Sequence, residues 1–230
     1  MSDLPVPPLV FGPFASILYV VVSVAILMTI KDRRAATGIV VVNALGAGIY
    51  ALAAVADLAG LGLIASLLLV PFMEEFTRHR ILTGRRGVAS VLWLGLLWGT
   101  AELAINSLPA LMLGEAYRSP TLLAGSAAVA VIISNLIFHV CQSLLMASGM
   151  DSHRPRYRVV GLNTGLHSLF NFYALFSAAL FAINPTAGLV ALGLRLGVVA
   201  IVLAFLLVRC ASKQAADVPA SGQAIANDAT

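Results

Sequence analysis

The sequence has few charged residues and few cysteines, and each shortage excludes a class of protein. Asp, Glu, Lys and Arg make up 10% of the 230 residues, whereas 60% are hydrophobic. Soluble domains carry about 25% charged residues, so a soluble globular domain is excluded. The two cysteines, Cys141 and Cys210, form neither a disulfide framework nor a metal-binding CxxC pair. The first residues also lack the basic segment of a secretory signal, and the first apolar run is therefore expected to remain as a membrane helix.

The net charge of +4 does not indicate a nucleic-acid partner, because the basic residues lie in short clusters between apolar runs. Seven of these runs approach the length of about 20 residues that a spanning helix needs. They cover approximately residues 9–30, 38–58, 61–80, 88–108, 121–148, 159–182 and 186–208. The partner that this composition predicts is the lipid bilayer.

The distribution of Lys and Arg predicts the orientation. Twelve of the 14 fall in alternate loops and in the C-terminal tail, which the positive-inside rule places in the cytoplasm. We therefore expect an all-α, polytopic membrane helical bundle of about seven transmembrane helices, N-out/C-in, in the cell (inner or cytoplasmic) membrane. Its parts would be an extracytoplasmic N-terminus (1–8), one transmembrane helical domain (9–208) and a disordered cytoplasmic tail (209–230).

One stretch, residues 71–80, places two adjacent carboxylates at the end of an uncharged apolar run. A charge near the centre of a bilayer costs about 2.5–3.5 kcal/mol, so Glu74 and Glu75 need partners inside the protein. Glu102, His139 and His167 lie on three later apolar runs. With a rise of about 1.5 Å per residue, these groups are expected in or near the inner leaflet.

Polar residues spaced four apart mark one face on each of three expected helices. These stripes are Trp98, Glu102 and Asn106; Asn135, His139 and Ser143; and Asn163, His167 and Asn171. Such stripes are typical either of hydrogen bonding between helices or of an active site. Arg78, four residues after Glu74 and three after Glu75, is in the same way either a counter-ion or a topology anchor. Gly95 and Gly99 are expected at a close helix contact.

Paired carboxylates in a medium of low dielectric constant favour general-base chemistry, because the charged form is disfavoured there. Such a base can activate water, while histidine and asparagine stabilise an oxyanion. This combination predicts hydrolysis of peptide bonds within the membrane. Two histidines and a glutamate are also a common zinc set, but neither HExxH nor a His-xxx-His pair is present. A mechanism without metal or other cofactor is therefore favoured.

The motifs Glu74-Glu75-Phe-Thr-Arg78, Trp98-Gly-Thr-Ala-Glu102, His139 and His167-Ser-Leu-Phe-Asn171 resemble, in this order, those of the glutamic-type intramembrane proteases. That superfamily includes the PrsW and YhfC branches and the CAAX-prenyl/bacteriocin-processing enzymes. The resemblance implies a membrane-protein or peptide substrate, with the glutamate pair as base. It further implies that His167 and Asn171 serve the oxyanion. The chain departs from the family in having EExxR and a final Asn, where the PrsW branch has EExxK and Asp.

Three alternatives stay open at this point. The helix layout, with Gly-Leu-His-Ser at 165–168, also resembles the anterior-pharynx-defective scaffold subunit of gamma-secretase, which implies membrane-protein partners and no catalysis. Buried Glu and His are typical of proton-coupled carriers too, although paired broken helices are not seen in the sequence. Finally, His139 and His167 at similar depth are compatible with a bis-histidine haem.

Overall fold

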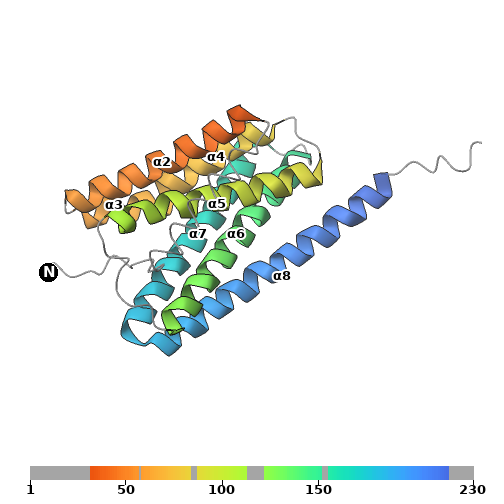
Figure 1. Cartoon of the computed structure of the whole chain (residues 1–230). Coiled ribbons are helices and arrows are strands. Elements are labelled where there is room, and N and C mark those ends of the chain that lie inside the picture. The colour runs from red at the N-terminus through yellow and green to blue at the C-terminus, as the bar shows by residue number, and fades with distance from the viewer. Residues whose placement is uncertain (1–31, 57, 84–86, 113–121, 152–154, 218–230) are drawn as a thin grey trace, which may run out of the picture.

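A computed structural model describes residues 32–56, 58–83, 87–112, 122–151 and 155–217, and it is helical throughout these ranges. The elements are α2 (Arg33–Val55), a continuous helix formed by α3 (Ala59–Ile64), the π-helical η1 (Ala65–Leu69) and α4 (Val70–Leu82), and then α5 (Val88–Met112), α6 (Leu122–Asp151), α7 (Arg156–Ile183) and α8 (Pro185–Asp217). These six helices overlap the second to the seventh of the apolar runs (Figure 1). The first run, residues 9–30, lies outside the described residues.

Within the described residues, three helices are long and apolar enough to cross a membrane, which corrects the seven spans expected. They are Gly60–Leu82, Val129–Met150 and Pro185–Cys210, and Val88–Ala104 forms a shorter apolar helix. α7 carries Asn163, His167 and Asn171 along its length, and it is not among the three helices found in the described residues. The finding supports a multi-pass, all-helical membrane protein.

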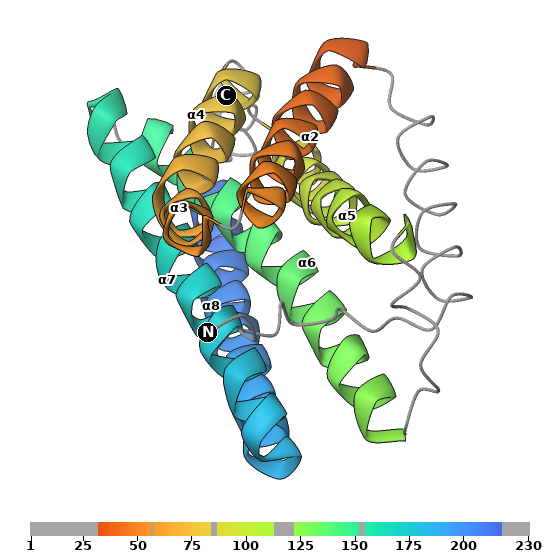
Figure 2. The ribbon, with the colours of Figure 1, turned by 90° about the vertical axis from the view of Figure 1, so that its left-hand side faces the viewer.

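The C-terminal helix is longer than expected. α8 continues to Asp217, so residues 209–217 are helical where a disordered tail was predicted. Residues 218–230 lie outside the described part. Figures 1 and 2 show α6, α7 and α8 extending together beyond α2, α4 and α5, toward the end where α7 turns into α8.

The helix that carries the glutamate pair widens at η1, and Pro71 explains why. A proline has no N–H, and its ring collides with the carbonyl four residues earlier in a regular α-helix. In the wider π turn, the N–H of Val70 donates instead to the carbonyl of Ala65. The next carbonyl, that of Ser66, would take its hydrogen bond from residue 71, which has no N–H to give. The side-chain amide of Asn171 on α7 supplies the donor, with 2.9 Å between Nδ2 and the Ser66 oxygen.

Two glycines bring α5 against α6, as the sequence predicted. A Cβ on Gly95 would lie 2.5 Å from the Cα of Val140, so no larger residue fits there without moving a backbone. A Cβ on Gly99 would lie 3.2 Å from the ring of His139. This close approach holds His139 against the face of α5 that also carries Glu102.

Candidate active site

Four helices bring five ionisable side chains to one place: Glu74 and Glu75 from α4, Glu102 from α5, His139 from α6 and His167 from α7. Four of them are at most 2% exposed, while the side chain of Glu102 is 16% exposed. Burial of so many charged groups in a lipid-soluble bundle is favourable only when they pair with one another. The contacts below show that they do.

Glu75 is the centre of the pairing. Its Oε1 atom accepts a hydrogen bond from Arg78 at 2.5 Å and another from Nδ1 of His167 at 2.9 Å. Arg78 is fully buried and also lies over the ring of Trp98, 4.5 Å from its centroid. Arg78 is therefore a counter-ion to Glu75, one of the two roles its spacing allowed.

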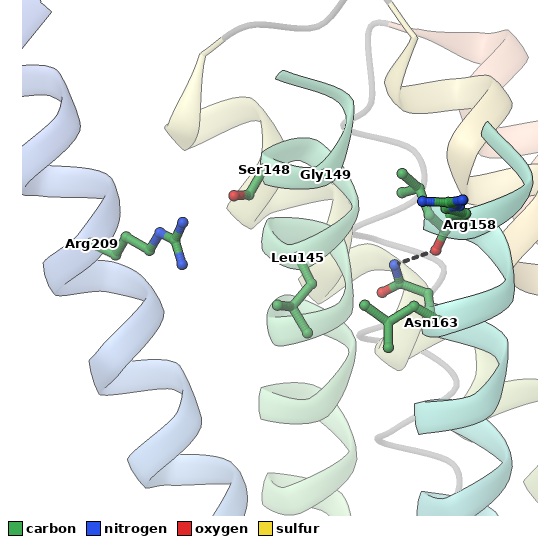
Figure 3. A pocket seen from close by; sticks show the side chains of 8 residues that line it. Leu145, Ser148, Gly149, Arg158, Asn163 and Arg209 are labelled. Carbon is green, nitrogen blue, oxygen red and sulfur yellow. Dashed lines mark hydrogen bonds between the residues drawn. The ribbon is translucent and has the colours of Figure 1, made fainter. Parts of the chain in front are cut away.

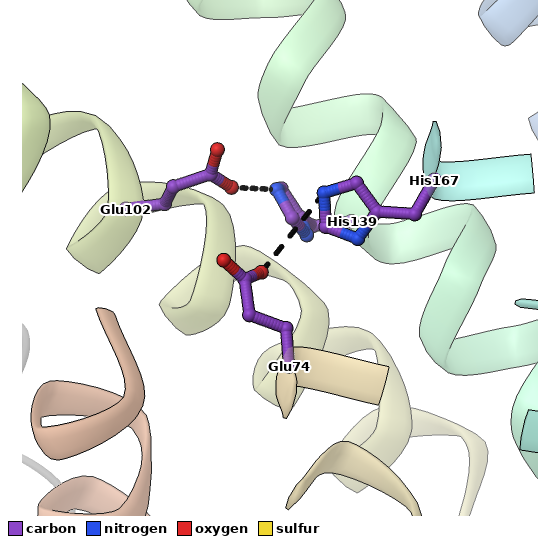
Figure 4. A group of neighbouring side chains, drawn as sticks. All are labelled: Glu74, Glu102, His139 and His167. Carbon is purple, nitrogen blue, oxygen red and sulfur yellow. Dashed lines mark ion pairs between the residues drawn. The ribbon is translucent and has the colours of Figure 1, made fainter. Parts of the chain in front are cut away.

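The contact between Arg78 and His139 fixes the protonation of that imidazole. The second guanidinium nitrogen of Arg78 donates to Nδ1 of His139 at 2.7 Å. Because a guanidinium can only donate, Nδ1 must accept, and the neutral ring carries its hydrogen on Nε2. That Nε2 atom pairs with Oε2 of Glu102 (Figure 4).

His167 has the opposite tautomer. Its Nδ1–H donates to the Glu75 carboxylate, so the lone pair of the neutral ring is on Nε2. Nε2 faces Oε2 of Glu74 across 4.0 Å (Figure 4). Glu74 in turn accepts a hydrogen bond from the indole Nε1 of Trp98 at 2.8 Å. Nε2 of His167 and the Glu74 carboxylate therefore face each other, and each group is held by a further hydrogen bond.

A metal ion could take its ligands from four of these side chains, whose donor atoms all lie within 4.8 Å of one another: Glu74, Glu102, His139 and His167. Zinc binds an imidazole lone pair at about 2.0–2.1 Å. His167 presents such a lone pair on Nε2, but His139 presents an N–H while Arg78 occupies its Nδ1. The full set of four ligands therefore fits a metal only if the contact between Arg78 and His139 breaks.

Aromatic rings close one side of the cluster, a role that their positions in the sequence had not indicated. Phe138 meets the rings of His139 and His167 edge-on, at centroid distances of 5.3 and 5.2 Å. It also stacks on Phe170, over which the guanidinium of Arg195 lies at 3.8 Å. Arg195 thus has a cation–π partner. The signal in the sequence was the spacing of Phe170, three residues after His167, which puts both side chains on one face of the helix.

Asn171 is not part of this group. Its half-buried amide donates to the Ser66 carbonyl in η1, about two turns before the glutamate pair. The cluster is also closed, because four of its five ionisable side chains are at most 2% exposed. Two cavities in the described part of the chain lie elsewhere, and none of the clustered residues lines either of them.

Comparisons of the chain with protein families, with curated proteins and with solved structures gave no match. The chemistry of the site therefore rests on its geometry. Carboxylates, imidazoles of defined tautomer and a buried guanidinium can transfer protons and stabilise a developing negative charge.

Proposed function

We propose that this protein is an intramembrane endopeptidase, which hydrolyses peptide bonds of membrane-associated substrates with a glutamate-activated water. The observation that carries the proposal is the convergence of Glu74, Glu102, His139 and His167 within 4.8 Å of one another, from four helices. Association of the helices does not by itself require these four ionisable side chains. Apolar packing, or hydrogen bonds of neutral Asn and Ser, stabilises a bundle with a smaller desolvation cost.

Glu74 is the better candidate for the general base. The charge of Glu75 is already used by Arg78 and His167, at 2.5 and 2.9 Å. Glu74 accepts from the neutral indole of Trp98 and faces the lone pair of His167 across 4.0 Å. A separation of this size suits a water molecule that is hydrogen-bonded to both groups.

The proposed reaction then follows in two steps. Glu74 takes a proton from the water molecule while the oxygen of that water attacks the scissile carbonyl carbon. The carbonyl oxygen then becomes an oxyanion. The Nε2–H of His139, held in place by Arg78 through Nδ1, is the donor for this oxyanion. As the C–N bond breaks, the leaving nitrogen receives the proton from Glu74. Substrate entry must move Glu102 off His139, and Glu102 is the most exposed member of the cluster.

A second function is favoured by the closure of the cluster. All five ionisable groups have partners inside the protein, and α5 packs on the backbone of α6 at Gly95. A scaffold subunit that assembles membrane-protein partners needs such a closed, rigid polar core and no water-activating base. Under this proposal the charges fix the packing of α4 to α7.

The deciding experiment is reconstitution of the purified protein with membrane-anchored peptide substrates, followed by detection of the fragments. Glu74→Gln keeps the hydrogen bond with Trp98 but removes the basicity, so the rate should fall by about 10²–10⁴-fold. The scaffold proposal predicts no cleavage by the wild type and unchanged partner recovery with the variant. Full cleavage activity in both Glu74→Gln and Glu75→Gln would rule out the glutamate mechanism.

We also propose the cell (inner) membrane as the location, with N-out/C-in orientation of the helical bundle. The support is the alternation of the basic loops and the three long apolar helices. This orientation puts the glutamate pair near the cytoplasmic leaflet.

A further inference from the structure

A cavity of about 420 Å³ lies between α6, α7 and α8, apart from the Glu/His cluster (Figure 3). Leu145 on α6 and Leu162 on α7 contribute apolar walls. Volumes of about 300–1,000 Å³ are typical of sites for small molecules and headgroups. The cavity is large enough for a ligand, and the proposed peptidase activity does not use it.

The cavity lies where the helices leave the membrane. The apolar span Val129–Met150 ends five residues after Leu145, and the span Pro185–Cys210 ends next to Arg209. α7 begins at Arg156, two residues before the Arg158 that lines the cavity. A ligand bound here would therefore have its polar part at the membrane surface and its apolar part against the bundle.

The polar wall carries two arginines from different helices, Arg158 and Arg209. Neither forms an ion pair with a carboxylate among the residues whose side chains are described. Arg158 contacts the ring of Tyr157 at 5.9 Å, and the side chain of Arg209 reaches from α8 toward α6 (Figure 3). Both side chains are exposed, and two guanidinium groups without a carboxylate partner around one cavity favour an anion. Phosphate is one of the anions that Arg binds through paired N–H donors.

Asn163 adds a requirement for a hydrogen-bond donor. It is 1% exposed and lines the same cavity, and its Nδ2 donates to the carbonyl of Val159 at 2.9 Å. Its Oδ1 atom is buried and accepts no hydrogen bond from the protein. Figure 3 shows this oxygen pointing toward α6. A buried acceptor without a donor costs about 1–3 kcal/mol, so a ligand that brings a hydroxyl group would be stabilised here.

We propose that this cavity binds one anionic glycerophospholipid with a hydroxylated headgroup. Arg209 from α8 and Arg158 from α7 supply positive charge on two sides of the cavity for its anionic headgroup, the headgroup hydroxyl donates to Oδ1 of Asn163, and the acyl chains follow Leu145 and Leu162 into the bilayer. Basic pockets between membrane helices on the cytoplasmic side are a recurring type of phospholipid site. The helix ends that form this cavity carry the basic clusters that the positive-inside rule assigns to the cytoplasm.

The test uses the full chain in detergent and counts retained lipid by native mass spectrometry. Three probes are compared: phosphatidylglycerol, phosphatidylmethanol and phosphatidylcholine. Phosphatidylmethanol has the same phosphodiester charge but no headgroup hydroxyl. We expect phosphatidylglycerol to bind most tightly and phosphatidylcholine least. Arg158→Gln and Arg209→Gln should each weaken its binding by about 10-fold, the usual worth of one charge-assisted hydrogen bond.

Two controls separate the site from general membrane electrostatics. Arg34→Gln removes an exposed charge of α2 that does not line the cavity, and it should leave binding unchanged. Asn163→Leu should lower the binding of phosphatidylglycerol to the level of phosphatidylmethanol.

An equal loss of lipid binding in Arg34→Gln and Arg158→Gln, or retention of phosphatidylcholine equal to that of phosphatidylglycerol, would overturn the site. Displacement by inorganic phosphate at the concentration of the lipid would assign it to a soluble phosphate compound instead. Glu74→Gln should bind lipid like the wild type, so a failure of the peptidase proposal can be distinguished from a failure of the lipid site.

Discussion

Nδ1 of His167 lies 2.9 Å from Oε1 of Glu75, so a single carboxylate oxygen joins α7 to α4 over 92 positions of the sequence. The same oxygen accepts from Arg78, which in turn donates to His139. One carboxylate therefore sets the ring orientation of His167 directly and that of His139 through the guanidinium. The two adjacent glutamates therefore differ: Glu75 orients both imidazoles, and Glu74 faces Nε2 of His167.

The first prediction is that the two glutamates differ in their effect on stability. Glu75→Gln leaves the buried guanidinium of Arg78 without its anion, and loss of one partner of a buried ion pair costs about 3–5 kcal/mol. Glu74→Gln removes a buried charge and keeps an acceptor for Trp98, so the free energy of unfolding should change by less than about 1 kcal/mol. Unfolding in mixed micelles measures both variants. Equal destabilisation would show that Glu75 does not organise the cluster.

The second prediction concerns metal dependence. Because Arg78 occupies Nδ1 of His139, a metal ion cannot take all four candidate ligands without breaking that hydrogen bond. Cleavage activity should therefore survive dialysis against a strong chelator within about twofold, measured with elemental analysis of the dialysed protein. Loss of activity that added zinc restores would replace the glutamate mechanism by a metal-dependent one, with Arg78 displaced.

The sequence predicted the helices well, because hydropathy records directly which segments can lie in lipid. It did not predict η1, since residues 61–70 are apolar apart from Ser66 and show no break in the helical pattern. The widening comes from Pro71, which has no N–H and whose ring collides with a carbonyl of the preceding turn. Every apolar run was counted as a span, whereas three helices of the described residues are long and apolar enough to cross a membrane.

The candidate site was predicted by residue type but not by pairing. Spacing puts His139 and His167 on defined helix faces, but the rotation of each helix depends on packing contacts such as the one at Gly95. Asn171 shares a face with His167. Periodicity could not show that its amide donates to a backbone carbonyl of another helix, that of Ser66. The helical rise gives only an approximate depth for Glu102, and it could not show the pairing with His139 that the structure contains.

The third prediction tests the close contact between α5 and α6. In Gly95→Ala the new methyl group would lie 2.5 Å from the Cα of Val140, so the helices must separate and the free energy of unfolding should fall by about 1–3 kcal/mol. Gly161→Ala on α7 is the matched control, because no atom lies within 4 Å of its Cβ position. The control should be neutral or more stable by up to about 1 kcal/mol, as alanine favours helix. Similar losses in both variants would contradict the contact.

The fourth prediction concerns orientation. A reporter fused after Lys213, near the end of α8, should be active only if it functions in the cytoplasm. A paired reporter that functions only outside the cytoplasm, fused at the same residue, should be silent. The reverse pattern would invert the bundle and place the cavity with Arg158 and Arg209 at the outer surface.

The fifth prediction separates a structural role of Asn171 from the oxyanion role that the protease resemblance implied. Its amide donates to the Ser66 carbonyl, which has no backbone donor because residue 71 is a proline. Asn171→Ala leaves that carbonyl unpaired and should lower the free energy of unfolding by about 1 kcal/mol. Pro71→Ala supplies the missing N–H, so Asn171→Ala should cost only a few tenths of a kcal/mol in that background. The cavity left by the shorter side chain is the same in both backgrounds and cancels in the double-mutant cycle.

Removal of an oxyanion donor would instead slow cleavage by about 10²–10³-fold in either background, with no coupling to residue 71. We expect coupling of about 1 kcal/mol in stability and cleavage rates within about twofold of the wild type. A cycle without coupling, together with a large loss of rate, would return Asn171 to the catalytic group.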